Sequence, residues 1–178
     1  MKHIYQIFSP LILILLLGTS CQSTPHTAQK IELANVLENK VQVSITLEKD
    51  QSGQFILSAT FTPQDPNLHF YSKDIPITGI NGIGRPTLLE LPKDSPMQII
   101  GDLKESVSPQ IPNTPPLELL TYPAGAITLS LPILLPGGNN WIEDEVIVSY
   151  MACDENGCRP PVQKKSIAIN IPGNELFQ

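Results

Sequence analysis

Short segments in which apolar and polar residues alternate recur along most of this chain. The segment VQVSITLE (41–48) alternates throughout, and FILSATFT (55–62) follows it after a polar turn at residues 50–53. A period of two is the spacing of a β-strand with one buried face. These two segments therefore predict a β-hairpin. Further candidate strands cover residues 68–72, 87–91, 97–100, 117–122, 126–135, 145–152 and 166–172.

Proline punctuates the candidate strands. The chain has 18 prolines spread along its length, and after residue 20 no stretch of ten or more residues carries a 3.6-residue apolar stripe free of Pro and Gly. Because proline removes a backbone donor, it is confined to strand edges, bulges and turns. Many short strands with this punctuation predict an all-β fold, an immunoglobulin-like antiparallel β-sandwich. Trp141 is then expected in the core or at its rim.

Residues 101–116 (GDLKESVSPQIPNTPP) form the least regular segment of the predicted domain. A solvated loop between strands is the simpler interpretation of this composition. The alternative is a lid over a functional site, because long loops in compact domains sometimes take that role.

The N-terminus has the composition of a secretory signal peptide. Lys2 precedes an apolar run that ends at Leu17, and small residues follow up to Cys21. The run contains Pro10 and is too short to cross a bilayer comfortably. The sequence LLGTSC resembles a bacterial lipobox, in which cleavage precedes a cysteine that receives lipid. Gly18 stands where that pattern usually has Leu, so an ordinary cleaved signal is the alternative.

The predicted organisation is a lipoprotein signal peptide (1–20), a flexible tether (21–35) and one β-sandwich domain (36–178). The whole chain carries a net charge of −6, and loss of Lys2 makes it more negative. An acidic chain of this kind is a poor candidate for binding nucleic acid. It is also a poor candidate for binding anionic lipid headgroups through charge, so membrane attachment is expected to depend on lipid at Cys21.

If Cys21 is lipidated, Cys153 and Cys158 in MACDENGCRPPV are the two cysteines that remain. A metal site is not expected, because His26 and His69 are the only histidines after the signal and there is no second cysteine pair. A structural disulfide is one interpretation, since a turn at Asn156-Gly157 would bring the cysteines opposite each other. Closing so small a loop stabilises a domain by only about 2 kcal/mol, against nearly 5 kcal/mol for a loop of about a hundred residues.

A redox-active pair is the other interpretation. Arg159 would favour a thiolate at Cys158, whereas Asp154 and the glutamate after it would oppose one at Cys153. Cys158 is therefore expected to be the better nucleophile. Pro160 and Pro161 lack N–H donors, which predicts a sheet edge that a partner can approach.

The segment VIVSYMACDENGCRPPVQKKSIAIN (146–170) resembles the end of the N-terminal periplasmic domain of the DsbD family of thiol:disulfide interchange proteins. In that family a strand ending in Tyr-Gln-x-Cys leads through a short acidic loop to a second cysteine, Pro-Pro and a last strand. Met151 stands where the family commonly has Gln, and residues 65–92 also resemble the family. The resemblance covers about residues 36–172. The matching residues are Tyr150, Cys153, Cys158, Pro160 and Pro161.

The resemblance implies an immunoglobulin-like sandwich that takes electrons from a thioredoxin-like domain and passes them to disulfide-bonded periplasmic proteins. It implies that Cys158 forms the mixed disulfide with the partner and that Cys153 resolves it, without a bound cofactor. The family places an aromatic of its cap loop over the disulfide, but residues 101–116 contain none. Phe70 and Tyr71 are the candidates for that role here. The family's eight-helix membrane module and thioredoxin-like module are not found after Pro172, so a free-standing module with a separate electron donor is expected.

The sequence therefore leaves two functional hypotheses. The leading one is a lipid-anchored, periplasm-facing envelope protein that relays dithiol and disulfide equivalents through Cys153 and Cys158. The alternative is a binding or adaptor module with the same sandwich and an inert disulfide.

Overall fold

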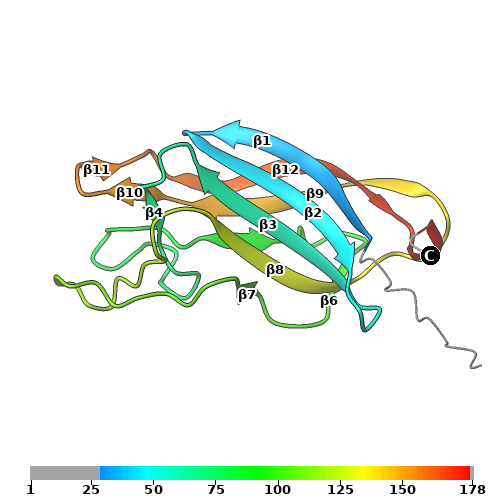
Figure 1. The fold of residues 1–178 in the computed structure, drawn as a ribbon. Helices are drawn as coiled ribbons and strands as arrows, with labels where there is room; N and C mark the ends of the chain where they lie inside the picture. The colour runs from blue at the N-terminus through cyan, green and yellow to red at the C-terminus, as the bar shows by residue number, and fades with distance from the viewer. Residues whose placement is uncertain (1–28, 177–178) are drawn as a thin grey trace, which may run out of the picture.

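A computed structural model describes residues 29–176, almost all of whose regular structure is antiparallel strand (Figure 1). The predicted signal peptide and Cys21 lie outside these residues. Within the described part, no helix is long and apolar enough to cross a bilayer. The strands are β1 (Lys30–Glu38), β2 (Val41–Lys49), β3 (Phe55–Pro63), β4 (His69–Phe70), β5 (Leu88–Glu90), β6 (Gln98–Ile99), β7 (Lys104–Glu105), β8 (Ile127–Leu134), β9 (Trp141–Tyr150), β10 (Ala152–Asp154), β11 (Gly157–Cys158) and β12 (Val162–Pro172), followed by the short 3-10 helix η1 (Asn174–Leu176).

The strands form one large sheet and two small ones. The large sheet has the order β1-β2-β3-β8-β6, and β7 also pairs with β8. A second sheet has the order β12-β9-β5, and a third has the order β11-β10-β4. Every one of these strand pairs is antiparallel.

The main core lies between the large sheet and the β12-β9-β5 sheet. Alternate residues of β2, of β8 and of the second half of β12 are buried, as a strand with one face toward a core requires. The predicted all-β antiparallel fold is confirmed, and the arrangement is consistent with a β-sandwich, while the immunoglobulin-like detail stays a prediction. The large sheet contributes Val41, Val43, Ile45, Leu47, Leu57, Ala59, Phe61, Ile127, Leu129, Leu131 and Ile133, and the opposite sheet contributes Val146, Val148, Tyr150, Ile167, Ile169 and Ile171.

The predicted tether was wrong at its C-terminal end, because β1 begins at Lys30 rather than after residue 35. A β-bulge between Glu32 and Ala34 shifts the register of β1 against β2. Leu33 is the extra residue of this bulge, and Ile31, Leu33 and the adjacent Ala34 are all half-buried. The bulge thus breaks the period of two on which recognition of a strand depends.

Some short predicted strands are smaller than expected. Residues 68–72 and 97–100 contain only the two-residue strands β4 and β6. Residues 117–122 form no strand, although Thr121 makes single bridges to Tyr71 and Gln110. Trp141, expected in the core or at its rim, is 59% exposed at the start of β9.

The chain changes sheets directly after β9. β9 pairs with β12 and β5 up to Tyr150, and after Met151 the chain continues as β10 and pairs with β4. The fully buried Tyr150 marks this junction, since its hydroxyl donates to the Glu38 carbonyl at 3.1 Å. The β10–β11 hairpin therefore extends at the end of the molecule opposite to the end where β1 begins (Figure 1).

Leu129 and Leu134 give a test of this core within one strand. Leu129 is fully buried and Leu134 is 48% exposed. Leu129→Ala should lower the free energy of unfolding by about 2–5 kcal/mol, because it removes apolar contacts and leaves a cavity. Leu134→Ala is the matched control and should change it by less than about 0.5 kcal/mol. Denaturant unfolding of the disulfide-bonded protein measures both, and equal losses would contradict the assignment of β8 faces.

Candidate functional site

A tight hairpin holds both cysteines. β10 pairs with β11 so that Cys153 lies opposite Cys158 and Asp154 lies opposite Gly157. The Asp154 carboxylate accepts the backbone N–H groups of Asn156 at 2.8 Å and Gly157 at 3.0 Å. Gly157 has a φ of 142°, in a region that favours glycine. The turn thus follows from the sequence Asp-Glu-Asn-Gly.

Cys153 and Cys158 form a disulfide across this hairpin, with their Cα atoms 4.0 Å apart. The two bonded sulfurs belong to residues of very different exposure. Cys153 is 2% exposed, whereas Cys158 is exposed. The difference follows from strand order, because Cys153 lies on the central strand β10 and Cys158 lies on the edge strand β11.

Tyr71 lies against the buried sulfur. Its hydroxyl donates to Cys153 Sγ at 3.3 Å and lies 3.9 Å from Cys158 Sγ. Backbone bridges from Tyr71 to Pro86 and Thr121 fix its position. Burial raises the pKa of the Tyr71 phenol, so the hydroxyl keeps its proton and remains a donor at neutral pH.

Phe70, the other aromatic candidate, lies elsewhere. Its side chain is fully buried in the main core, where its ring centroid is 6.1 Å from that of Phe61 and 6.2 Å from that of Tyr150. Successive residues of a strand face opposite sides. Because His69 is paired with Cys153, residues 69 and 71 face the disulfide and residue 70 faces the sandwich core.

A small apolar cluster surrounds the contact between Tyr71 and Cys153. Ile75 is buried with them, and Leu119, Leu120 and Met151 pack against the cluster. Sequence reasoning missed Leu119 and Leu120, although two adjacent leucines between prolines and a tyrosine are a signal of burial. These two leucines contribute to the apolar surroundings of Cys153.

The packing around Tyr71 also depends on Gly84. A Cβ at this position would lie 2.8 Å from Leu119 Cδ1 and 3.1 Å from two ring carbons of Tyr71. The φ of Gly84 is 79°, which side-chain-bearing residues rarely adopt. The GIGRP sequence therefore permits the close approach of the 84–86 segment to Tyr71.

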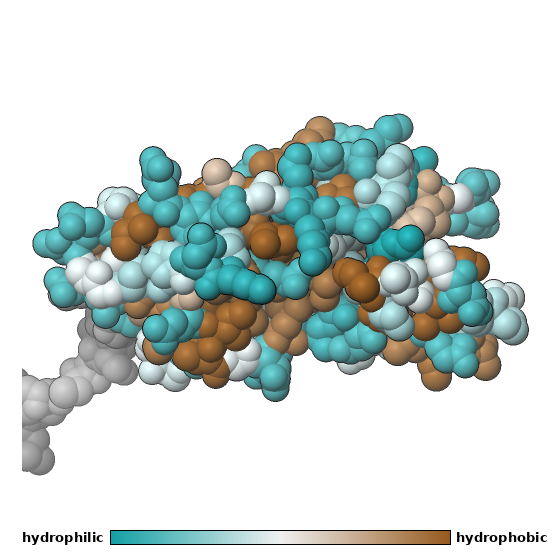
Figure 2. Space-filling model, turned by 180° about the vertical axis from the view of Figure 1, so that it is seen from behind, coloured by the Kyte–Doolittle hydropathy of each residue, from teal (hydrophilic) through white to brown (hydrophobic). Residues whose placement is uncertain are grey.

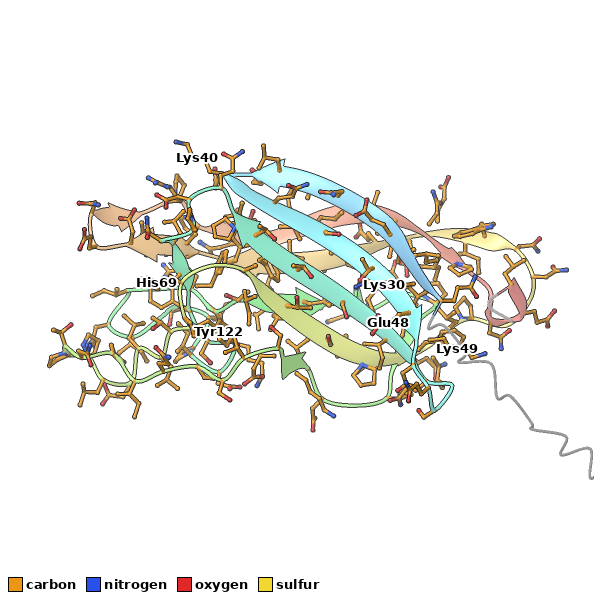
Figure 3. The ribbon with its side chains drawn as sticks, viewed as in Figure 1. Lys30, Lys40, Glu48, Lys49, His69 and Tyr122 are labelled. Atoms are coloured by element: carbon orange, nitrogen blue, oxygen red, sulfur yellow. A yellow bond between two sulfur atoms is a disulfide. The ribbon has the colours of Figure 1, made fainter. Side chains whose placement is uncertain are left out.

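His69 completes the cysteine-facing side of β4 (Figure 3). Its ring centroid is 5.6 Å from that of Tyr71, in an edge-to-face arrangement. Burial lowers the pKa of His69, and the Asp154 carboxylate opposes this shift in part. The imidazole beside the site is thus favoured in its neutral form.

The charge of Arg159 is paired with a carboxylate of the same hairpin. Its guanidinium Nη2 lies 4.0 Å from an oxygen of Asp154. The Arg159 backbone N–H donates to Ala152 at 2.8 Å, so strand alternation places the Arg159 and Cys158 side chains on opposite faces of the hairpin. The positive charge expected to favour a Cys158 thiolate is therefore shared with a carboxylate.

The prolines behind the hairpin lie next to the turn between β1 and β2. The Pro160 carbonyl accepts a hydrogen bond from Asn39 Nδ2 at 2.9 Å, and Asn39 lies in the turn between β1 and β2. Pro161 is exposed, and the buried Val162 then begins β12. This contact fixes the outgoing leg of the hairpin to the large sheet.

No known protein family, curated protein or solved structure matches this chain. Among residues 29–176, no three His, Cys, Asp or Glu side chains gather in a way that could hold a metal ion. The disulfide is compatible with either a redox or a structural role.

The environment of His69 predicts a pH dependence of stability. Because its pKa is lowered in the folded state, the unfolded chain binds the proton more readily as the pH falls through about 6.5. His69 therefore contributes to the stability of the folded state above that pH, and this contribution is lost on acidification. The difference in unfolding free energy between the native protein and His69→Gln should therefore be larger at pH 7.5 than at pH 5. Chemical unfolding at the two pH values measures it, and a pH-independent difference would refute the lowered pKa.

The Tyr71 hydroxyl should accelerate opening of the disulfide. When dithiothreitol attacks Cys158, Cys153 leaves as a thiolate, and a hydrogen bond to a charged group contributes about 1.5–3 kcal/mol. Tyr71→Phe should therefore slow reduction about tenfold. Tyr122→Phe is the matched control, because the Tyr122 hydroxyl accepts the Lys73 N–H and no described contact joins it to the cysteines. Samples quenched at successive times and assayed for free thiols give the rates of reduction. Equal rates for Tyr71→Phe and the native protein would exclude a role of the hydroxyl in opening the disulfide.

Proposed function

We propose that this protein is a thiol:disulfide interchange module of the bacterial cell envelope. It relays electrons between a thioredoxin-like donor and disulfide-bonded periplasmic proteins through Cys153 and Cys158, and its chemistry needs no bound cofactor. The observation that carries the proposal is that the two bonded cysteines differ in exposure. Cys158 is exposed, whereas Cys153 is buried and accepts a hydrogen bond from the Tyr71 hydroxyl.

This arrangement gives each sulfur a separate step. A donor thiolate attacks the sulfur of Cys158, the exposed residue of the pair, the Cys153–Cys158 bond breaks, and Cys153 leaves as a thiolate next to the Tyr71 hydroxyl. The donor's second thiol then attacks the mixed disulfide and releases Cys158. Both cysteines of this protein are now reduced, and the donor carries the disulfide. In the next exchange the Cys158 thiolate attacks a partner disulfide, and Cys153 resolves the mixed disulfide. Two electrons pass to the partner.

The loops around Tyr71 offer apolar contacts for a protein partner. Ile77 and Ile83 belong to the segment before Pro86, and Ile111 and Leu117 belong to the segment before Thr121; all four are between 48% and 69% exposed. The bridges Tyr71–Pro86, Tyr71–Thr121 and Gln110–Thr121 bring these segments together beside the disulfide. Exposed apolar side chains that gather near a reactive group are typical of a protein-binding surface.

Lys73 and Arg85, two cations near these segments, both have partners close by. Lys73 contacts the carboxylates of Asp74 at 2.7 Å and Glu105 at 3.4 Å. The Arg85 guanidinium donates to the backbone carbonyls of Thr78, Gly82 and Gly84. Carboxylates therefore neutralise the charge of Lys73, and the Arg85 guanidinium is directed toward its own loop, which favours apolar contact over electrostatic attraction of a partner.

Lipid at Cys21 would hold the module on the membrane, facing the periplasm. The domain begins at Lys30, at the end opposite the cysteine hairpin (Figures 1 and 3). A chain anchored ahead of β1 would therefore present Cys158 away from its anchor. A mass spectrum of the mature protein without acyl groups would remove this part of the proposal.

A structural disulfide in an adaptor module is the second candidate. The observation in its favour is that Cys153 is buried with Tyr71 and Ile75 in an apolar cluster, as a purely structural half-cystine would be. In this case the bridge would only hold the β10–β11 hairpin, and the exposed apolar side chains would bind a partner without exchange.

Trapping of mixed disulfides separates the two functions. Cys153→Ser leaves the exposed Cys158 without its resolving thiol and should accumulate mixed disulfides with envelope proteins. Cys158→Ser is the matched control and should trap far fewer, because Cys153 is buried. Non-reducing electrophoresis of cells treated with acid and a thiol-blocking reagent measures both.

The reduction potential of the native pair gives an independent criterion. A relay should equilibrate with glutathione or thioredoxin buffers, whereas structural disulfides lie below about −300 mV. A potential below that value, together with the absence of trapped partners, would reject the relay and support the adaptor.

A further inference from the structure

Exposed apolar side chains also gather at the end of the domain where β1 begins. Strand register defines this end, because Lys30 pairs with Glu48, Lys49 pairs with Phe55, and Phe55 pairs with Ile133. β8 ends at the next residue, Leu134, which pairs with β6. The exposed large apolar residues of these elements and of the adjoining loops are Ile99, Ile100, Leu134, Trp141 and Leu176.

Trp141 is the most informative of these five residues. It is the only tryptophan of the chain and is 59% exposed. The segment around it, PGGNNWI (136–142), carries no charge, and η1 is held against this loop by hydrogen bonds to the carbonyls of Pro136 and Gly138. Figure 2 shows hydrophobic side chains, among hydrophilic ones, at the end of the domain where β1 begins. A loop segment without charged residues that exposes an indole suits the boundary between lipid and water.

We infer that this end of the sandwich rests on the surface of a lipid bilayer, with Trp141 at the interface. The occupant is a lipid surface rather than a protein because the proposed anchor lies so near. Cys21 is nine residues before Lys30, and a chain of that length spans at most about 30 Å even when fully extended.

The anchor and the apolar end act together. Five apolar side chains alone bind a bilayer weakly, but a short flexible linker gives an effective concentration in the millimolar range. The anchored domain then stands with its strands directed away from the membrane, and the β10–β11 hairpin is presented at the far end. The inference rests on the lipid-anchoring part of the proposed function and is independent of the exchange chemistry.

The test uses the chain from Cys21 onward, which keeps every residue that the structure describes. The Cys21 thiol is coupled to a maleimide-headgroup lipid in phosphatidylcholine vesicles while Cys153 and Cys158 remain bonded to each other. Trp141 emission should shift to shorter wavelength and lose intensity when the vesicle lipid is brominated. Because the anchor is chemical, this result does not depend on acylation in the cell, which the mass of the mature protein tests separately.

A relocated probe is the matched control. Trp141→Phe combined with Leu117→Trp moves the single tryptophan to the loops beside the disulfide, at a position that is 52% exposed. Brominated lipid should quench Trp141 at least about twofold more than the relocated tryptophan, because only the former lies at the interface. Equal quenching at the two positions, or no quenching of Trp141 in vesicle-bound protein, would overturn the inference.

A second variant separates contact from mere proximity to the anchor. Leu134→Ser and Leu176→Ser together remove apolar side chains from this end and leave Trp141 and the linker intact. The quenching of Trp141 should fall if these residues rest on the lipid. Unchanged quenching would show that the short linker alone brings Trp141 near the bilayer, and would contradict the docked orientation.

Discussion

The pairing of β10 with β4 on one side and β11 on the other is the interaction on which the cysteine site depends. It makes β10 the central strand of a three-stranded sheet, so Cys153 is covered while its bonded partner lies at the edge. The same pairing sets His69 opposite Cys153, and alternation along β4 then brings Tyr71 to the sulfur. Tyr150 stabilises the junction where the chain leaves the sandwich for this sheet, because its hydroxyl bonds β9 to the end of β1.

The long strands could be predicted because their buried faces are regular. β2 alternates apolar and polar residues throughout, β3 and β8 do so over most of their length, and the registers of β2 with β3 and of β3 with β8 contain no bulge. β1 was missed because its bulge shifts the alternation by one residue, and the short strands beside the site carry too few residues to show a period. The turn between the cysteines could be predicted because Asp154 and Gly157 act locally.

The surroundings of the disulfide could be predicted only in part. Tyr71 and Phe70 were equivalent candidates in the sequence, and only the pairing of His69 with Cys153 decides which of them faces the sulfurs. Leu119 and Leu120 reach the site through a segment that forms single bridges rather than a strand. The ion pair of Arg159 with Asp154 depends on the side-chain direction within the hairpin, which sequence neighbours alone do not give.

The position of the disulfide outside the main core has a consequence for the energy of the two oxidation states. Cys153 belongs to the small cluster with Tyr71, whereas the residues that hold the two large layers together belong to a separate cluster. The bridge also spans a sequence separation of only five, so opening it restores little chain entropy to the unfolded state. Opening the bridge is therefore expected to affect the β10–β11 hairpin more than the packing of the two large layers.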